Sequence, residues 1–153
     1  MSVEPFPENI IAVLREKLQE LDGVEAIVAR SLEPTDPNGC IGIVVDGWRM
    51  EDVEMGGFGE TASIYEFSIQ HMVKHTNQEE GQKTHRLVAR NLRRMLVRDQ
   101  SLRVALGQLQ DGEYPVERSL LWKVPTQRFA SDEIAGQFVF LSVTELNFHT
   151  QTS

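Results

Sequence analysis

The residue types best suited to acid–base or metal chemistry gather in one short stretch of the chain. Residues 71–85, "HMVKHTNQEEGQKTH", contain three of the four histidines and two adjacent glutamates. Imidazole and carboxylate groups are common zinc ligands and common general acids and bases. Whether these groups can act together depends on their spacing in the secondary structure that carries them.

The histidines lack the spacing of a metal site. Residues 63–75 alternate as a half-buried strand does, which places His71 and His75 about 13 Å apart. Two imidazoles that far apart cannot share one zinc ion at about 2 Å each. His85 follows a turn and could approach one of them, but the spacing indicates no third ligand. We therefore expect surface or sheet-edge histidines, with no bound metal and no cofactor.

The other reactive residue types also lack a catalytic arrangement. Glu79 and Glu80 stand where a long helix is expected to begin, and negative charge there stabilises the helix dipole. Adjacent helical residues do not face each other, so these carboxylates do not form an acid–base pair. The three glycines of "GGFGET" (56–61) lack the lysine and Ser/Thr of a phosphate-binding loop, and no GxSxG motif is present. The single cysteine, Cys40, lies in an apolar run and is expected to be buried. We expect that the chain is not an enzyme.

Length and composition indicate one soluble domain covering residues 1–153. The chain is long enough for one hydrophobic core, and it is 41% hydrophobic and 25% charged. No stretch approaches the roughly 20 apolar residues of a membrane span. The first residues lack the apolar segment of a signal peptide, so we expect residence in the cytoplasm.

Positive charge is concentrated in one segment of an otherwise acidic chain. The net charge is −8, which argues against general affinity for nucleic acid. Between Gln82 and Arg103 there are seven basic residues and one acidic residue, while the rest of the chain has eight basic and 22 acidic residues. Such a separation of charge suits self-association or docking on a charged partner.

This segment predicts an amphipathic helix from about Glu79 to Arg98. One side of the helix is expected to pack on a sheet: Thr84, Val88, Asn91, Leu92, Met95 and Leu96. The opposite side is basic and forms our candidate interface with a neighbouring subunit or partner: Lys83, Arg86, Arg90, Arg93 and Arg94. This basic side faces water, an acidic neighbour or phosphate groups. No aromatic residues alternate with the arginines, so base stacking is not indicated.

The remaining pattern predicts an α+β fold in which an N-terminal helix and the long central helix pack on a mainly antiparallel sheet. An extended hairpin or loop is expected around residues 48–61, and the last strand is expected to be central or covered because both its faces carry apolar groups. The predicted elements are a helix over 7–21, a strand over 24–30, a strand from Cys40 that bends near Asp46 and Gly47, the alternating strand, the long helix, a short helix over 101–109, and strands over 118–130 and 136–150.

This order of elements resembles the tail terminator, or tail-completion, proteins of long-tailed bacteriophages. The resemblance covers residues 7–150 and consists of element order, length and a junction between strand and helix, "YEFSIQHMVKHTNQEEGQKTHRLVARNLRRML". An alternating terminal strand, "GQFVFLSVTELNFHT", completes it. It includes no catalytic or ligand-binding motif. Head-side neck proteins share much of this plan, so a head-side neck or adaptor protein remains the alternative, with a small metal- or ligand-binding domain as a further one.

The resemblance implies a structural virion protein in the tail–neck region that is assembled in the host cytoplasm. Such proteins form rings, usually hexamers, which cap the tail tube, stop its polymerisation and join it to the head connector. The implied partners are further copies of the chain, the tail tube protein and the head–tail connector protein; DNA passes through the lumen without sequence-specific binding, and no membrane is involved. Residues of the expected loop that could reach the tube are Trp48, Met50, Met55, Gly56, Gly57 and Phe58.

Overall fold

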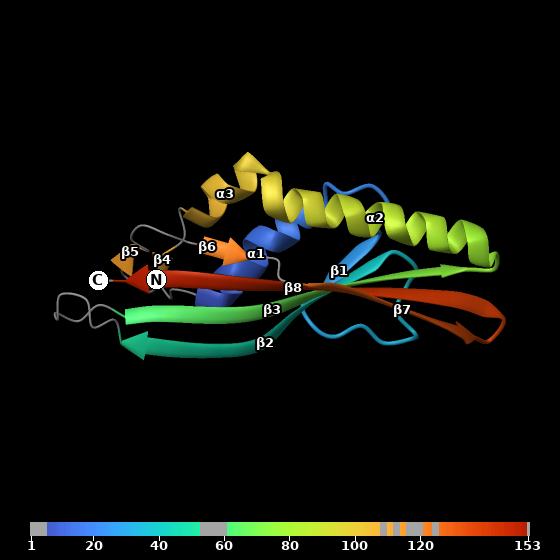
Figure 1. Ribbon diagram of the computed structural model, residues 1–153, viewed down its shortest axis with the longest axis horizontal. Helices are drawn as coiled ribbons and strands as arrows, with labels where there is room; N and C mark the ends of the chain where they lie inside the picture. The colour runs from blue at the N-terminus through green and yellow to red at the C-terminus, as the bar shows by residue number, and fades with distance from the viewer. Residues whose placement is uncertain are drawn as a thin grey trace.

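The computed structural model describes residues 6–52, 61–107, 110–111, 114–115, 121–123 and 126–152 (Figure 1). The helices in this part of the chain are α1 (Phe6–Leu18), α2 (Gln78–Arg98) and α3 (Gln100–Gly107). The strands of the main sheet are β1 (Ala26–Val28), β2 (Cys40–Asp52), β3 (Thr61–His75), β6 (Leu121–Lys123), β7 (Gln127–Ile134) and β8 (Gln137–Thr152). A separate two-stranded sheet contains β4 (Gln110–Asp111) and β5 (Tyr114–Pro115).

The main sheet has the order β1-β2-β3-β8-β6, and β7 also pairs with β8. Only the β1–β2 pair is parallel among the described strands; the other pairs are antiparallel. On one edge β8 pairs with β3, and on the other it pairs first with β7 and then with β6. Figure 1 shows the helices together on one side of the sheet. These observations confirm the predicted α+β class and the central position of the last strand.

The core lies between the helices and one face of the sheet. Alternation along β3 and β8 sends the same set of side chains to this face, because residues directly opposite in paired strands share a face. Phe67 of β3 and Phe148 of β8 meet edge to face with ring centroids 5.3 Å apart. The core cluster contains these side chains together with leucines and isoleucines of all three helices and of β1 and β2. Cys40 is buried, as predicted, and burial raises the pKa of its thiol.

Helix α2 begins where the sequence predicts, for an identifiable reason. The side chain of Asn77 accepts a hydrogen bond from the backbone N–H of Glu80, which satisfies one of the free donors of the first turn. At the other end, Asp99 follows α2 and accepts a hydrogen bond from the backbone N–H of Leu102. Asp99 therefore separates α2 from α3 and caps the second helix. No helix in the described part of the chain is long and apolar enough to cross a bilayer.

The predicted bend in β2 is present as a break in register. The pairing of β2 with β3 shifts between Val45 and Gly47, so Asp46 is an extra residue on β2. Beyond this bulge, β2 and β3 continue together with β8, which stays paired with β3 as far as Thr61, as a ribbon that extends away from α2 (Figure 1). Trp48 and Met50 lie on this ribbon. Four other candidate tube-contacting residues lie outside the described residues: Met55, Gly56, Gly57 and Phe58.

Three predicted elements have different bounds in the structure. The first helix ends at Leu18 instead of continuing to residue 21, and the chain turns through Gly23, whose φ is +87°. The following strand is limited to β1. The strand predicted over 118–130 is divided into β6 and β7, and β7 continues to Ile134. Ala135 and Gly136 then have φ values of 53° and 80°, the left-handed values of a tight hairpin turn into β8.

Replacing Gly81 with alanine should destabilise the fold, although alanine is the better helix former by roughly 1 kcal/mol. A Cβ at this position would lie 2.7 Å from both the His75 Cβ and a ring carbon of Phe140. Overpacking of this kind costs about 1–3 kcal/mol, so the free energy of unfolding should fall. Urea unfolding followed by circular dichroism measures it. The neighbouring Gln82→Ala change, at an exposed position, should not reduce stability. A Gly81→Ala protein as stable as the wild type would show that α2 does not sit this close to the sheet.

Candidate interaction surface

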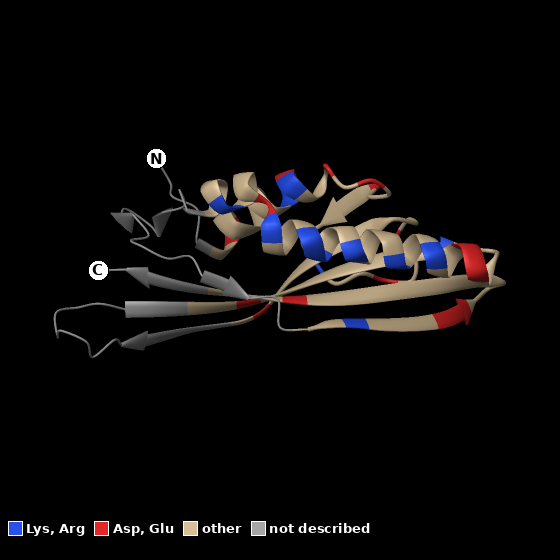
Figure 2. Cartoon of the chain, turned by 45° about the horizontal axis from the view of Figure 1, so that its top comes forward, with Lys and Arg blue, Asp and Glu red and all other residues tan. Residues whose placement is uncertain are grey.

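The basic residues predicted as an interface are all exposed along α2. Figure 2 shows basic residues following one another along this helix. The row contains Lys83, Arg86, Arg90, Arg93 and Arg94, and Arg98 extends it. None of these six side chains makes a hydrogen bond or ion pair within the described part of the chain. We call these six residues the basic row.

The opposite side of α2 is buried, but not through all the residues that the sequence suggested. The buried residues are Gly81, His85, Val88, Ala89, Leu92 and Leu96. Thr84, which the helical pattern placed on the packed side, is exposed, so that prediction was wrong. His85 lies on the buried side instead, four residues after Gly81 and three before Val88, which is the spacing of one helix face.

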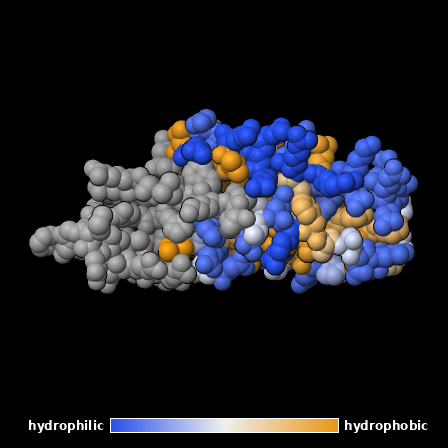
Figure 3. All heavy atoms as spheres, in the orientation of Figure 1, coloured by the Kyte–Doolittle hydropathy of each residue, from blue (hydrophilic) through white to orange (hydrophobic). Residues whose placement is uncertain are grey.

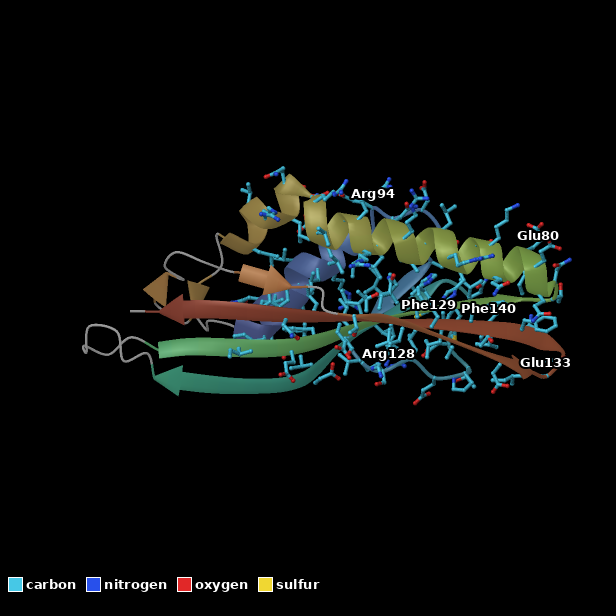
Figure 4. The ribbon with its side chains drawn as sticks, viewed as in Figure 1. Glu80, Arg94, Arg128, Phe129, Glu133 and Phe140 are labelled. Atoms are coloured by element: carbon cyan, nitrogen blue, oxygen red, sulfur yellow. The ribbon has the colours of Figure 1, made fainter. Side chains whose placement is uncertain are left out.

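The five arginines of the basic row, together with Val97, form one wall of a groove of about 430 Å³. The other wall comes from β7, through Gln127 and Phe129. The Gln127 side-chain amide donates hydrogen bonds to the backbone oxygen of Ala89 (2.9 Å) and to the hydroxyl of Thr144 (3.0 Å), which joins β7, α2 and β8. Phe129 is 56% exposed, and its ring meets the His85 ring edge to face with centroids 5.7 Å apart. Figure 4 shows Phe129 directed toward α2 and Arg128 directed away from it.

Sequence reasoning missed Phe129 and Gln127 because both lie on a strand with little apolar alternation. Strand β7, "QRFASDEI", has one half-buried residue at its start and seven exposed ones. It pairs with β8 along one edge, and its other edge is unpaired within the described residues. An exposed aromatic residue on a polar strand was the available signal. The basic row, Phe129 and the unpaired edge of β7 thus belong to one continuous surface, which Figure 3 shows as largely hydrophilic around α2.

The histidines behave differently from the expectation of surface or sheet-edge groups. His71 and His85 are buried, with 0% and 3% of their surfaces exposed. Their rings are stacked, with centroids 5.8 Å apart and planes within 9° of parallel. Both ring nitrogens of His71 and the Nε2 atom of His85 have no hydrogen-bond partner within the described residues. The buried Ser142 hydroxyl, on the residue that pairs with His71 across β3 and β8, also has none there.

Burial controls the charge of this histidine pair. It lowers the pKa of His71 to about 4, with a further contribution from His85, and it lowers the pKa of His85 to about 4. His75 is at the end of β3, where its Nδ1 atom accepts a hydrogen bond from the backbone N–H of Asn77 (2.8 Å). No group of three potential metal ligands occurs in the described part of the chain. The lone pair of an imidazole nitrogen lies in the plane of its ring, so one metal ion cannot lie in the planes of two stacked, parallel rings. His71 and His85 therefore pack against each other as neutral groups.

Comparison with known proteins identifies no family for this chain. No protein-family model matches it, and no curated protein sequence matches it significantly. Its function therefore has to be argued from its own surface and fold.

Replacing His85 with leucine should reduce the loss of stability in acid. A histidine in an unfolded chain has a pKa of about 6.5, whereas in the folded chain that of His85 is about 4. The unfolded state therefore takes up the extra proton as the pH falls below about 6.5, and stability is lost down to about pH 4. One histidine contributes up to about 1.4 kcal/mol per pH unit in this range. Urea unfolding at a series of pH values measures the slope.

The matched control for this experiment is Thr84→Leu, which adds the same side chain at the neighbouring exposed position and should leave the slope unchanged. A His85→Leu protein with the wild-type slope would mean that this imidazole is protonated in the folded chain without cost. That result would contradict the buried, neutral histidine pair.

Proposed function

We propose that this chain is a structural virion protein: a ring-forming tail terminator that caps the phage tail tube, stops its polymerisation and joins the tail to the head connector. The basic row on α2 is the observation that carries the proposal. Five arginines and a lysine are exposed side by side without a partner in the described residues, on a chain whose other segments are strongly acidic. A surface of this kind fits contact with an acidic neighbour.

The physical argument starts from the repulsion within the row. Like charges three or four residues apart on a helix destabilise it by a few tenths of a kcal/mol per pair. An acidic surface removes this repulsion, and arginine binds carboxylates in a paired, planar geometry that lysine cannot reproduce. Since the rest of the chain has 22 acidic and eight basic residues, a second copy offers such a surface. Repetition of one such contact around an axis produces a ring.

Two further features support this role. The chain contains the junction on which the resemblance depends: β3 ends at His75, Asn77 caps the next helix, and α2 begins at Gln78. The ribbon of β2, β3 and β8 beyond the bulge extends away from α2, in a position suited to reach the tail tube (Figure 1). The role requires no catalytic group, and the stacked histidines are enclosed between α2 and the sheet.

The proposal is tested by mixing the purified chain with tail tubes and imaging the tubes by negative stain. The expected result is a ring at one end of each tube, together with tubes that no longer lengthen. Binding to isolated portal complexes in place of tubes would assign the chain to the head side of the neck. A chain that associates with neither tubes nor portal complexes would overturn the proposal. Binding of duplex DNA that weakens with salt would assign the basic row to phosphate instead.

Changing Arg90 and Arg94 together to glutamate should impair assembly more than folding. Both side chains are exposed and leave the buried side of α2 untouched, so the free energy of unfolding should change by less than about 0.5 kcal/mol. Capping of tubes should fall at least about tenfold, because contacts between opposite charges become repulsive. Gln82→Glu with Thr84→Glu adds negative charge to α2 at two exposed positions outside the groove and serves as the control. Equal losses of monomer stability and of assembly would show that the arginines act within the subunit.

A further inference from the structure

Charge is ordered along the side of the molecule that contains the unpaired edge of β7. One end is basic: Arg90 and Arg94 are on α2, and Arg128 is near the start of β7. Acidic residues gather at the other end, where Glu80 is in the first turn of α2 and Asp132 and Glu133 are near the end of β7; Lys83 and Arg86 of the basic row lie between the two ends. Figure 4 shows Glu80 and Glu133 at one end of the molecule and Arg94 and Arg128 away from it. The charges on β7 are therefore complementary to themselves when the direction of the strand is reversed.

The edge between these two ends is free to accept a strand. Every residue of β7 after Gln127 is exposed, and β7 pairs only with β8 within the described part of the chain. An unpaired edge presents backbone donors and acceptors that readily bind another strand. An antiparallel partner reverses the direction of the charges. A second copy of the same edge therefore satisfies both the backbone groups and the side chains.

We propose that β7 pairs antiparallel with β7 of a second copy, around a two-fold axis at Ala130, to form a symmetric dimer with a continuous sheet. An antiparallel pair of identical strands has its axis perpendicular to the sheet, which keeps both copies of α2 on the same side. Residues directly opposite each other in the two strands then share a face of the sheet. At the axis, one residue of β7 lies opposite the same residue of the second copy.

The charges select Ala130 as that residue. With the axis there, Arg128 lies opposite Asp132 of the second copy, and this pair occurs twice. An axis at Phe129 would place Arg128 opposite Ala130, and an axis at Ser131 would place it opposite Ile134. Opposite charges directly across an antiparallel pair stabilise it, whereas those other pairings leave the charges unmatched. Within its own chain Arg128 already bridges Glu145, at 3.4 Å, while remaining 69% exposed and accessible to a second carboxylate.

The same axis sets the two copies of α2 antiparallel to each other, with Lys83 and Arg86 nearest to the axis. His85 lies beside Phe129, and the backbone oxygen of Ala89 beside Gln127, so the axis at Ala130 falls near the level of residue 84 of the helix. The first turn of one α2 is then level with the turn between Arg86 and Arg90 of the other. The two central β8 strands are separated by three strand spacings, about 14 Å.

This inference stands on the edge strand and its charges, and it does not rest on the proposed function. Ring formation uses a contact that repeats in one direction, whereas the β7 pair closes on itself. A dimer of this kind places the groove between α2 and β7 of each copy next to the dimer axis.

Sedimentation velocity of the purified full chain across the micromolar range should show a monomer–dimer equilibrium. Asp132→Arg places two arginines opposite each other twice in each dimer and should raise the Kd at least about tenfold. Adding Arg128→Asp restores opposite charges across the axis and should return the Kd toward the wild-type value. All substituted positions are exposed, and circular dichroism checks that each variant folds. Rescue by the double change is the result that a merely structural effect of Asp132→Arg does not produce.

Disulfide trapping tests the register directly. Ala130→Cys places two thiols opposite each other with Cα atoms about 4.5–5.5 Å apart, within the range of a disulfide. Mild oxidation should therefore produce a covalent dimer, and Asp132→Arg in the same chain should reduce its yield. Asp22→Cys, exposed elsewhere on the surface, controls for random collisions. The natural Cys40 is buried and does not compete.

The outcomes separate this inference from the proposed ring. A monomer at all concentrations overturns the β7 pair, and so does a dimer that neither responds to Asp132→Arg nor becomes covalently linked when it carries Ala130→Cys. Rings on tail tubes together with either of those results would leave the proposed function standing alone. A trapped β7 dimer that never associates with tubes or portal complexes would leave the dimer standing and remove the proposed function.

Discussion

The packing of α2 across β3 and β8 is the constraint on which the rest of the structure depends. Its buried side, from Gly81 to Leu96, closes one half of the core, and the same helix geometry directs the basic row to the opposite side. The groove follows from this placement, because β7 pairs with the far edge of β8 and so lies beside the helix. Gln127 joins the three elements by hydrogen bonds to α2 and β8.

The same packing encloses polar groups that an ordinary core would avoid. His71 and His85 stack beneath α2 with unpartnered nitrogens in the described part of the chain, and the hydroxyl of Ser142 lies on the same face. Burying such groups without hydrogen bonds costs stability. Burial disfavours the charged form of an imidazole even more than the neutral form, which is why the pKa values of both histidines are low. This part of the core therefore carries a desolvation cost that the aromatic pair of Phe67 and Phe148 does not.

The parts of the fold that could be predicted were those with a strong local signal. Alternation identified β3 and β8, helical periodicity identified α2, and the Asp46–Gly47 pair identified the bulge. The burial of His85 was missed because an imidazole was expected at the surface, although His85 stands three residues before Val88 on the same face of the helix. Strand β7 has a mostly polar sequence, so its length and its place beside α2 come from pairing with β8. The basic row was evident in the sequence, but the groove that it forms with Phe129 exists only in the tertiary structure.

The long ladder between β3 and β8 also has a mechanical consequence. Fifteen residues of each strand are paired, from Thr61 opposite Thr152 to His75 opposite Phe138. A force that pulls the two strands along their length loads these hydrogen bonds in shear, so they must fail together instead of one after another. The ribbon that ends at Asp52 and Thr61 is joined to the helical body through this ladder. Tension applied at that end is thereby carried through the whole length of the molecule before any single strand can separate.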